Sequence, residues 1–307
     1  MSSFFRNIRR FVTDKDFRSL YLTYLGLYDN EDDESFLRRK FKALLHYDPD
    51  FTSPKTFNEK INWLKLHDRN PAYVTLVDKY EVKKFVSEKI GTEYVIPNLG
   101  VWDDSTAIDF DTLPDQFVLK CSHDSGSRVI CTDKAELDID KARRVMTKSL
   151  KNDYYLLNRE WPYKNVKRRI LAEKYIESKS GELNDYRIYC FNGEPMFFSI
   201  DLNVRSAIRV NFYDPDLNIL PFGAAEEPPD FYADVKIPDN VGEMLDIARI
   251  LAKGHAFIRV DLYNVEGKIY FSELTFFSYG GFMEIYPDRS WDQKIGDYLK
   301  LPESLKT

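Results

Sequence analysis

Hydrophobic residues recur at helical spacing through the first third of the chain and in short alternating runs after it. Thr56 and Glu59 form a capping box, and the apolar residues that follow keep helical spacing, so a helix is predicted to start there. A second helical pattern runs through residues 82–90, where Asp78 can cap the start and Gly91 stops the helix. Both segments are therefore predicted helices.

Short strand-like runs become frequent from residue 116 onward. The predicted strands are 94–97, 117–121, 129–131, 169–176, 185–191, 196–202 and 207–213, and further helices are predicted at 35–45, 137–150, 241–251 and 291–299. Strands and helices do not alternate strictly, as they would in repeated βαβ units. The pattern favours an α+β fold with mostly antiparallel sheets and flanking helices.

Residues 259–281 carry the most informative pattern. Two alternating apolar runs flank Gly267 and predict a β-hairpin whose loop is 264–268. If the strands pair about Gly267, Asp261 and Glu273 lie directly opposite each other, and two unpaired carboxylates at that distance repel. A divalent cation between them would make this a metal site, since Mg²⁺ takes one or two carboxylates plus phosphate oxygens. The alternative is two solvated acids on the outer face of an ordinary hairpin, and the hairpin alone does not decide.

The period of two along a strand puts Arg259 and Thr275 on the same face as these carboxylates. One hairpin face would then hold a cation, two carboxylates and a hydroxyl. That composition is typical of a site that binds a nucleotide and a metal.

Composition narrows the class of protein. The chain has 307 residues, of which 43% are hydrophobic, and 42 Phe plus Tyr against 13 Gly indicate a folded protein. Its net charge of −6 argues against non-specific nucleic-acid binding. Three cysteines without CxxC spacing and four scattered histidines predict neither a zinc site nor a disulfide framework, which fits the reducing cytoplasm.

No apolar run reaches the ~20 residues that a transmembrane helix needs.

Apolar and basic residues are interleaved over residues 4–12. Arg6, Arg9 and Arg10 interrupt the apolar residues, so this is not a cleavable signal sequence. Residues 4–12 could form a short basic amphipathic helix, and a helix of that kind can contact an anionic membrane surface. A terminal helix that packs on its own domain is the favoured interpretation.

Candidate nucleotide-binding groups precede the hairpin. Lys120 ends a strand just before the polar loop 122–128, where a lysine can contact phosphate while the backbone amides cover it. Taken alone, a surface lysine before a hairpin turn is the simpler interpretation. The backbone of strand 172–176 can read an adenine edge, and Asp185 can accept from ribose hydroxyls. Arg187 lies two residues later and shares its strand face.

The order of these groups resembles that of ATP-grasp carboxylate ligases. More specifically, several motifs are similar to the TupA-like ATP-grasp family, which is associated with teichuronopeptide and other bacterial surface polysaccharides. The motifs are KTFNEKINWLKLHDRNP, LPDQFVLKCSH, NREWPYKN, DYRIYCFNGEP, NFYDPD and RVDLYNVEGKIYFSELTF. The likeness runs from about Lys55 to Pro302 and implies an ATP-grasp fold, with the nucleotide held between two subdomains.

The resemblance also implies a role for particular residues, with ATP and Mg²⁺ as cofactors. The implied phosphate-binding residues are Lys79, Lys120 and the loop residues Ser122, His123, Ser125, Gly126 and Ser127. The implied adenine hinge is Glu173, Lys174, Tyr175 and Ile176, with Asp185 as the ribose or hinge acid. Arg259, Arg187 and Lys120 are implied at the transferring phosphate, and Asp261, Glu273 and Thr275 as metal ligands.

Two positions depart from the family pattern. Thr275 stands where ATP-grasp enzymes commonly have Asn. The phosphate-covering loop is poor in glycine, and Asp124 adds a negative charge to it.

The predicted activity is an ATP-dependent carboxylate–amine ligase that forms an amide through an acyl phosphate. The family setting suggests a uronic acid of a polysaccharide or its precursor as the acyl donor, and an amino acid or small amine as the acceptor. Arg205 and Arg209 are candidate clamps for the substrate carboxylate, with an exposed strand face as the equal alternative. A peripheral contact with a membrane-bound polysaccharide assembly is a further expectation, and no nucleic-acid partner is expected.

Two other functions compete with the ligase. A glycosyltransferase could use the DxD-like sequence 214–216, although no Rossmann-like series of βαβ units supports it. A degenerate nucleotide- or glycan-binding module would account for Thr275 and the altered loop.

Four segments are predicted. Residues 1–54 would form an N-terminal helical extension and 55–105 a linker subdomain. Residues 106–182 would hold the phosphate loop, and 183–307 the metal site.

Overall fold

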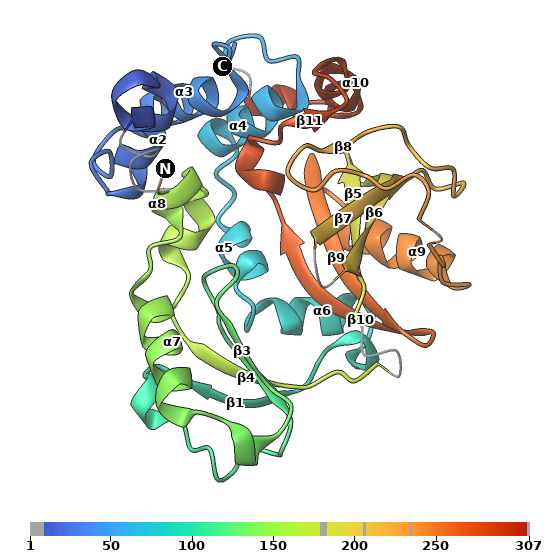
Figure 1. Ribbon diagram of the computed structural model, residues 1–307. Helices are drawn as coiled ribbons and strands as arrows, with labels where there is room; N and C mark the ends of the chain where they lie inside the picture. The colour runs from blue at the N-terminus through green and yellow to red at the C-terminus, as the bar shows by residue number, and fades with distance from the viewer. Residues whose placement is uncertain (1–8, 179–182, 205–206, 234, 306–307) are drawn as a thin grey trace.

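The computed structural model describes residues 9–178, 183–204, 207–233 and 235–305 (Figure 1). The helices are α2 (Lys15–Tyr24), α3 (Asp33–Leu45), α4 (Phe57–His67), α5 (Ala72–Val77), α6 (Val82–Ile90), α7 (Ile139–Lys151), α8 (Tyr155–Asn158), α9 (Val241–Ala252) and α10 (Ser290–Tyr298). The strands are β1 (Asn98–Trp102), β2 (Phe117–Cys121), β3 (Arg128–Cys131), β4 (Ile170–Lys174), β5 (Asp185–Phe191), β6 (Glu194–Val204), β7 (Ala207–Tyr213), β8 (Gly223–Ala224), β9 (Phe257–Val265), β10 (Lys268–Thr275) and β11 (Ile285–Tyr286).

The strands form two large sheets and one small one. A four-stranded sheet has the order β1-β4-β2-β3, a five-stranded sheet has the order β10-β9-β5-β6-β7, and β8 pairs with β11. Every strand pairing within these sheets is antiparallel. The predicted α+β class is therefore confirmed. Strand β1 joins the four-stranded sheet from the segment 55–105, and the domain limits themselves stay predictions.

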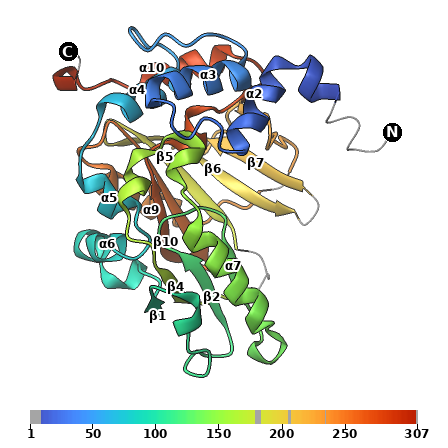
Figure 2. The same cartoon turned by 90° about the vertical axis from the view of Figure 1, so that its left-hand side faces the viewer.

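Each large sheet buries one face against helices. Helix α7 covers the four-stranded sheet, where Met146 packs with Phe117 and Leu119 of β2 (Figure 2). Helix α9 covers the five-stranded sheet, where Met244 and Ala248 belong to the same core as the β-strand residues. The opposite face of the five-stranded sheet carries the polar residues of the site described below, next to the buried aromatic residues Phe197 and Phe212.

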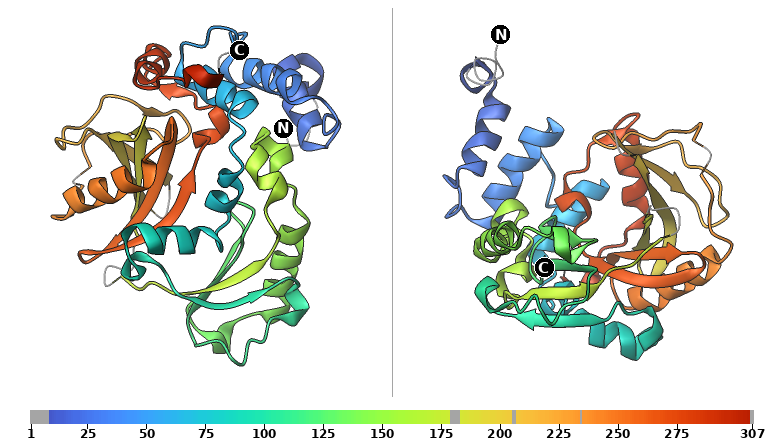
Figure 3. Two further views of the ribbon diagram at one scale, coloured as in Figure 1. Left: turned by 180° about the vertical axis from the view of Figure 1, so that it is seen from behind. Right: turned by 60° about the horizontal axis from the view of Figure 1, so that its bottom comes forward.

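A third core joins the two ends of the chain. Phe36 and Phe41 of α3 pack with Phe51 and with Phe282, which precedes β11. Helices α2, α3, α4 and α10 accordingly lie together at one end of the molecule (Figure 3). The predicted capping box at Thr56 and Glu59 is present at the start of α4.

The β9–β10 hairpin pairs Glu273 with Asp261 as predicted, but its turn and its register differ from the prediction. Strands β9 and β10 run to Val265 and from Lys268, so the turn is Glu266–Gly267 and not the predicted loop 264–268. Both turn residues have positive φ (54° and 87°), as a tight hairpin turn requires. A bulge between Phe271 and Glu273 then shifts the register by one residue. Because of this shift, Glu273 lies opposite Asp261, on the same sheet face.

Two local predictions were wrong. Residues 94–97 do not form a strand, because Tyr94 ends a short 3₁₀ turn and β1 begins only after Pro97, which lacks a backbone N–H. Asp78 does not cap α6 directly, since it accepts from the backbone N–H groups of Tyr80 and Glu81 in the turn before that helix.

The predicted N-terminal amphipathic segment lies mostly outside the described residues. Within the described part, Phe11 packs edge-on against Tyr21 of α2, with 5.6 Å between the ring centroids. No helix in the described residues combines the length and the apolar character that a membrane crossing requires.

Close approach of α10 to the start of α4 predicts that Gly296→Ala is destabilising. A Cβ at Gly296 would lie 2.3 Å from the carbonyl oxygen of Lys55 and 2.8 Å from the nitrogen of Phe57, and backbone atoms there cannot move aside cheaply. We expect the free energy of unfolding to fall by about 1–3 kcal/mol in urea denaturation. The matched control is Gly242→Ala in α9, where nothing lies within 4 Å of the new Cβ. This control should be neutral or stabilising by up to about 1 kcal/mol, and equal stability of the two variants would contradict the predicted clash.

Candidate active site

The face of the five-stranded sheet that α9 does not cover carries a row of charged and hydroxyl side chains. Cross-strand partners share a face, so the register defines this row without ambiguity. Its members are Asp185, Arg187 and Tyr189 of β5, Ser199 and Asp201 of β6, Arg259 and Asp261 of β9, and Glu273 and Thr275 of β10.

The four predicted hairpin residues meet in one ion cluster. Arg259 donates from Nε to Asp261 Oδ1 at 2.7 Å and from Nη2 to Oδ2 at 2.5 Å. The same Nη2 lies 3.4 Å from Glu273 Oε1 and 3.3 Å from Thr275 Oγ1. Thr275 in turn donates to Glu273 Oε1 at 3.3 Å. The cluster therefore presents two carboxylates and a hydroxyl, which are the oxygen donors that Mg²⁺ prefers.

Burial and charge act differently on the two carboxylates. Burial raises the pKa of Asp261, and the neighbouring Arg259 only partly opposes it. Burial acts on Glu273 in the same sense, but Lys79, Arg259 and Lys120 outweigh it, so the pKa of Glu273 is lowered. Glu273 is thus held as an anion by cations from three separate elements. In the described residues no three His, Cys, Asp or Glu side chains gather as a metal site of their own.

Lys79 connects this cluster to the phosphate loop. Its Nζ lies 2.5 Å from the carbonyl oxygen of Asp124 and 3.7 Å from Glu273 Oε2. Its backbone N–H donates to the carbonyl of Ser122 at 3.1 Å. One lysine between α5 and α6 therefore contacts both the four-stranded and the five-stranded halves of the site.

Lys120 lies in a second ion cluster that the sequence analysis did not anticipate. Its Nζ is 2.5 Å from Glu173 Oε2, and Lys83 of α6 lies 2.6 Å from Glu173 Oε1. Burial alone would raise the pKa of Glu173, but the two lysines outweigh it and the pKa is lowered. The Glu173 side chain therefore positions two lysines, and its carboxylate is fully occupied within the protein.

The phosphate loop is anchored at its base and exposed at its tip. Ser122 donates to the carbonyl of Lys167 at 2.7 Å, and His123 Nε2 lies 3.1 Å from the carbonyl of Asn152. Asp124 accepts from Ser149 of α7 at 2.5 Å, so its charge turns away from the loop opening. The side chains at the base of the loop are therefore already hydrogen-bonded within the protein.

The loop tip comprises Ser125, Gly126 and Ser127. Ser125 and Gly126 are exposed, Ser127 is half-buried, and Gly126 has a φ of 87°. The tip amides are therefore the part of the loop that can cover a phosphate.

The predicted hinge residues follow β4. Lys174 is exposed, and its N–H donates to the carbonyl of Pro97 at 3.1 Å. Tyr175 and Ile176 are half-buried in the segment after the strand. The described segment continues to Ser178, and residues 179–182 lie outside the described part of the chain.

Asp185 and Arg187 belong to the polar face of the five-stranded sheet. Arg187 hydrogen-bonds Asp201 and lies 3.7 Å from Asp185 and 3.6 Å from Glu227. Burial and the nearby Asp261 raise the pKa of Asp185 well above its usual value. Three carboxylates thus share one arginine beside the hairpin cluster.

Asp201 and Glu227 were missed by the sequence analysis. Burial raises the pKa of Asp201 to about 6, although Arg187 opposes the shift. Glu227 comes from the loop after β8 and accepts from Tyr279 Oη at 2.9 Å. Neither belongs to a local motif, and only the β5–β6 pairing brings Asp201 to this face.

A third missed group is the segment around η4 (Trp161–Asn165). Burial is the largest cause of the raised pKa values of Tyr154, Glu160 and Tyr163, and the charge on Glu273 contributes to all three. The sequence NREWPYKN served only as a mark of family resemblance. Its position beside the loop and the hairpin is a result of the fold.

Of the two predicted substrate clamps, the structure describes only Arg209. Arg205 lies outside the described residues. Arg209 pairs with Leu202 of β6, and this register turns it to the opposite face from Asp201. The DxD-like sequence forms a turn in which Asp214 accepts from the backbone and side chain of Asn218, so the motif has a structural role there.

Comparison with solved structures gives distant likenesses. The chain is 15% identical to a D-alanine–D-alanine ligase from Bacillus anthracis complexed with ATP, with a TM-score of 0.37 over 66% of this chain and 53% of that one. It is 14% identical to a D-alanine–D-alanine ligase from Helicobacter pylori, with a TM-score of 0.42 over 80% and 69% of the two chains. A D-cycloserine synthetase gives 16% identity and a TM-score of 0.40 over 75% and 72%. The matched part is about half of the length of the first of these relatives.

No curated protein matches the chain. The TupA-like ATPgrasp family model, in contrast, matches residues 59–300, which include every predicted site residue. This range takes in both large sheets and the ion clusters between them. The chain therefore belongs to the TupA-like ATP-grasp family.

Proposed function

We propose that the protein is an ADP-forming carboxylate–amine ligase. The observation that carries the proposal is the convergence of Lys79 and Arg259 on Glu273, which lies opposite Asp261 on one sheet face. Phosphoryl transfer depends on positioning and charge neutralisation and needs no nucleophilic side chain. A site built from cations and paired carboxylates suits that chemistry.

Asp261, Glu273 and Thr275 would hold Mg²⁺. The fit rests on their hard oxygen atoms and on the lowered pKa of Glu273, which keeps it ionised. When bound, Mg²⁺ would neutralise charge on the phosphate oxygens. Arg259 would stabilise charge at the transferring phosphate from the same face.

The triphosphate would be held by the opposite half of the site. Lys79 and Lys120 supply ammonium groups, and the tip amides 125–127 supply donors. Because Glu173 fixes Lys120 by a 2.5 Å ion pair, the lysine is positioned before the nucleotide arrives. Backbone groups of residues 173–176 would contact the adenine.

The reaction has two steps. A substrate carboxylate oxygen attacks the γ-phosphorus of ATP, the bond to the bridging oxygen breaks, and ADP leaves with an acyl phosphate formed. The acceptor ammonium first loses a proton to solvent, and the neutral amine nitrogen then attacks the acyl carbon. Phosphate leaves, and the nitrogen loses a second proton as the amide forms. No catalytic triad is required at either step.

The amine would approach the Arg187 side of the face. Asp185, Asp201 and Glu227 share Arg187 as their common cation, so a positively charged substrate group would be favoured there. The finer substrate assignment follows the family setting. The acyl donor would be a uronic acid of a bacterial surface polysaccharide or its precursor, and the acceptor an amino acid or small amine. The enzyme would work in the cytoplasm, in peripheral contact with a membrane-bound polysaccharide assembly.

The first prediction concerns turnover. ADP and phosphate release from ATP–Mg²⁺ should require both a carboxylate and an amine, tested with a matrix of uronic acids, oligosaccharides and amines. Glu273→Ala should lower kcat by on the order of 100-fold or more, because it removes a carboxylate that would hold the Mg²⁺ that neutralises the phosphate oxygens. Chelation of the metal should abolish release.

The matched control is Glu88→Ala on α6, whose side chain is 64% exposed and lies 3.9 Å from the exposed Lys84. It should leave kcat unchanged. Release that proceeds without any amine or carboxylate, or that survives in Glu273→Ala, would contradict the ligase. ATP binding without turnover in every combination would favour a degenerate nucleotide-binding module.

The second prediction concerns ATP affinity. Lys120→Met should weaken ATP binding by roughly 10- to 100-fold in isothermal titration calorimetry, since it removes a charge-assisted contact to phosphate. Lys84→Met, at a side chain that is 83% exposed, is the control and should bind ATP as the wild type does. Equal affinities in the two variants would exclude Lys120 from the phosphate site, and thermal melting checks that both variants fold.

A further inference from the structure

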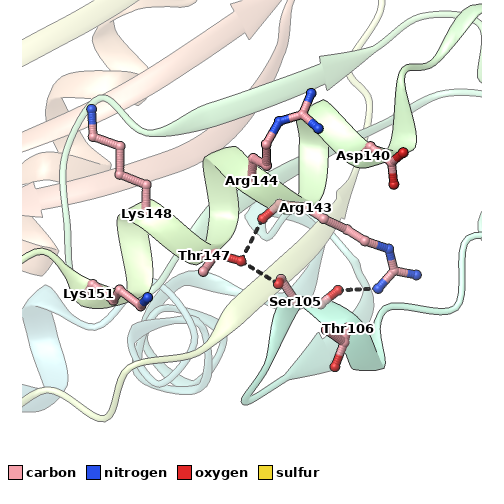
Figure 4. Close-up of a pocket in the computed structure, with 8 residues that line it drawn as sticks. All are labelled: Ser105, Thr106, Asp140, Arg143, Arg144, Thr147, Lys148 and Lys151. Carbon is pink, nitrogen blue, oxygen red and sulfur yellow. Dashed lines mark hydrogen bonds between the residues drawn. The ribbon is translucent and has the colours of Figure 1, made fainter.

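Lys83 of α6 is a cation that the proposed mechanism does not use. Its side chain is only 12% exposed. Lys148 and Lys151, in contrast, are exposed beside a cavity of about 520 Å³ on the outer face of α7 (Figure 4). Lysine side chains are seldom buried unless they are paired. The place of Lys83 inside the protein therefore requires partners that hold its charge there.

Three acceptors surround the ammonium group of Lys83. Its Nζ lies 2.6 Å from Glu173 Oε1 of β4. It also donates to the carbonyl oxygen of Ile96 at 2.8 Å and to Asn98 Oδ1 of β1. An ammonium group has three N–H donors. All three are thus occupied within the protein, and Lys83 has no donor left for a ligand.

Lys120 shares the Glu173 carboxylate but is not saturated in this way. Its Nζ lies 2.5 Å from Glu173 Oε2, which is its one ion-pair partner among the described residues. Burial acts to lower the pKa of Lys120, but nearby negative charges, above all that of Glu173, outweigh it and the pKa is raised. Tyr263 and Glu273 of the β9–β10 hairpin act in the same sense. Lys120 therefore lies toward the hairpin half of the site, with donors to spare.

Strand geometry sets this arrangement. Glu173 pairs with Asn98 of β1 on one side and with Val118 of β2 on the other. Lys120 lies two residues after Val118, so it shares the sheet face of Glu173. Leu119 points to the other face and belongs to the core that α7 covers. The group formed by Lys83, Glu173 and Lys120 therefore lies on the face of the four-stranded sheet away from α7.

Lys83 changes the charge that this group presents. Burial lowers the pKa of Lys83, although Glu173 opposes the shift. A carboxylate paired with a single lysine cancels the charge of that lysine, whereas a carboxylate between two lysines leaves one positive charge in excess. Lys83 therefore offsets the charge of Glu173, and the charge of Lys120 stays available to an anionic ligand.

We propose that Lys83 is a positioning residue of the ATP site, which acts through Glu173 on Lys120. The proposal rests on the proposed function, because that function places Lys120 at the ATP phosphates. In this relay, Lys83 fixes one oxygen of Glu173 and the other oxygen holds Lys120 in place. Helix α6 thus contributes to phosphate binding without contacting the nucleotide.

The test is a double-mutant cycle in the full-length protein, with the affinity for ATP–Mg²⁺ measured by isothermal titration calorimetry. Lys83→Met should weaken binding by roughly 3- to 30-fold, within the range of coupling between residues of one ion-pair network. In the Lys120→Met background, the same change should weaken binding by less than about twofold, because the group through which Lys83 acts is gone. Additive losses would indicate a merely structural role and would overturn the relay.

The conservative variant and a matched control complete the cycle. Lys83→Arg keeps the charge and should recover most of the affinity, and a loss as large as that of Lys83→Met would overturn the relay. Lys84→Met removes a charge from an 83% exposed side chain of the same helix and should bind ATP as the wild type does.

A second variant keeps the test decisive if Lys83→Met does not give a cooperative thermal melt. Lys83→Gln lacks the charge but can still donate to the carbonyl of Ile96, and it should weaken ATP binding in the same way. Wild-type affinity in whichever of the two variants folds would overturn the relay.

Binding and turnover together separate this inference from the ligase. Coupling between Lys83 and Lys120 in a protein that binds ATP but never releases ADP would support the relay and contradict the ligase. Turnover that requires a carboxylate and an amine, with additive losses in the cycle, would support the ligase and overturn the relay. A wild type that does not bind ATP would overturn both.

Discussion

Repulsion between Asp261 and Glu273 is the constraint on which the site depends. Two carboxylates directly opposed in a sheet weaken it unless cations neutralise them. Arg259 meets this need from the same hairpin, and Lys79 meets it from the turn between α5 and α6. Since Lys79 also holds the carbonyl of Asp124, the neutralisation of Glu273 ties the phosphate loop to the five-stranded sheet. The contacts of Lys79, which offset the repulsion between the two carboxylates, thereby also fix the geometry between the two halves of the site.

A single inserted residue makes that pairing possible. The turn Glu266–Gly267 alone would align Asp261 with Ser272 and turn Glu273 toward α9, where the face is apolar. The bulge before Glu273 leaves Ser272 without a partner and reverses the side on which Glu273 lies. Bulges are common beside active sites because they re-aim a side chain in this way. The site therefore depends on backbone geometry as much as on residue identity.

The local parts of this molecule were predictable from the sequence. Strands 117–121, 185–191 and 207–213 have the predicted bounds, and Thr56 caps α4, because each follows from neighbouring residues alone. The opposition of Asp261 and Glu273 was also predicted, although the placement of the turn was wrong and the bulge compensated for it.

The partners of Arg187 were not predictable. Asp201 and Glu227 are brought to it by pairings between elements distant in the sequence, and a side chain's face changes with a one-residue shift in register. Arg209 shows the same dependence, since only the β6–β7 register reveals that it faces away.

Charge divides the molecule around the phosphate loop. On one side, the outer face of α7 carries Arg144, Lys148 and Lys151, which are all exposed. On the other side, Asp185, Asp201 and Glu227 share Arg187, which suits a cationic acceptor. The two substrates of a carboxylate–amine ligase carry these opposite charges before they react. The protein's own charges are separated in the same sense, and a region with an excess of one charge attracts groups of the opposite charge. In the proposed reaction, Lys79, Lys120 and the carboxylates of the hairpin would serve the phosphoryl transfer that precedes amide formation.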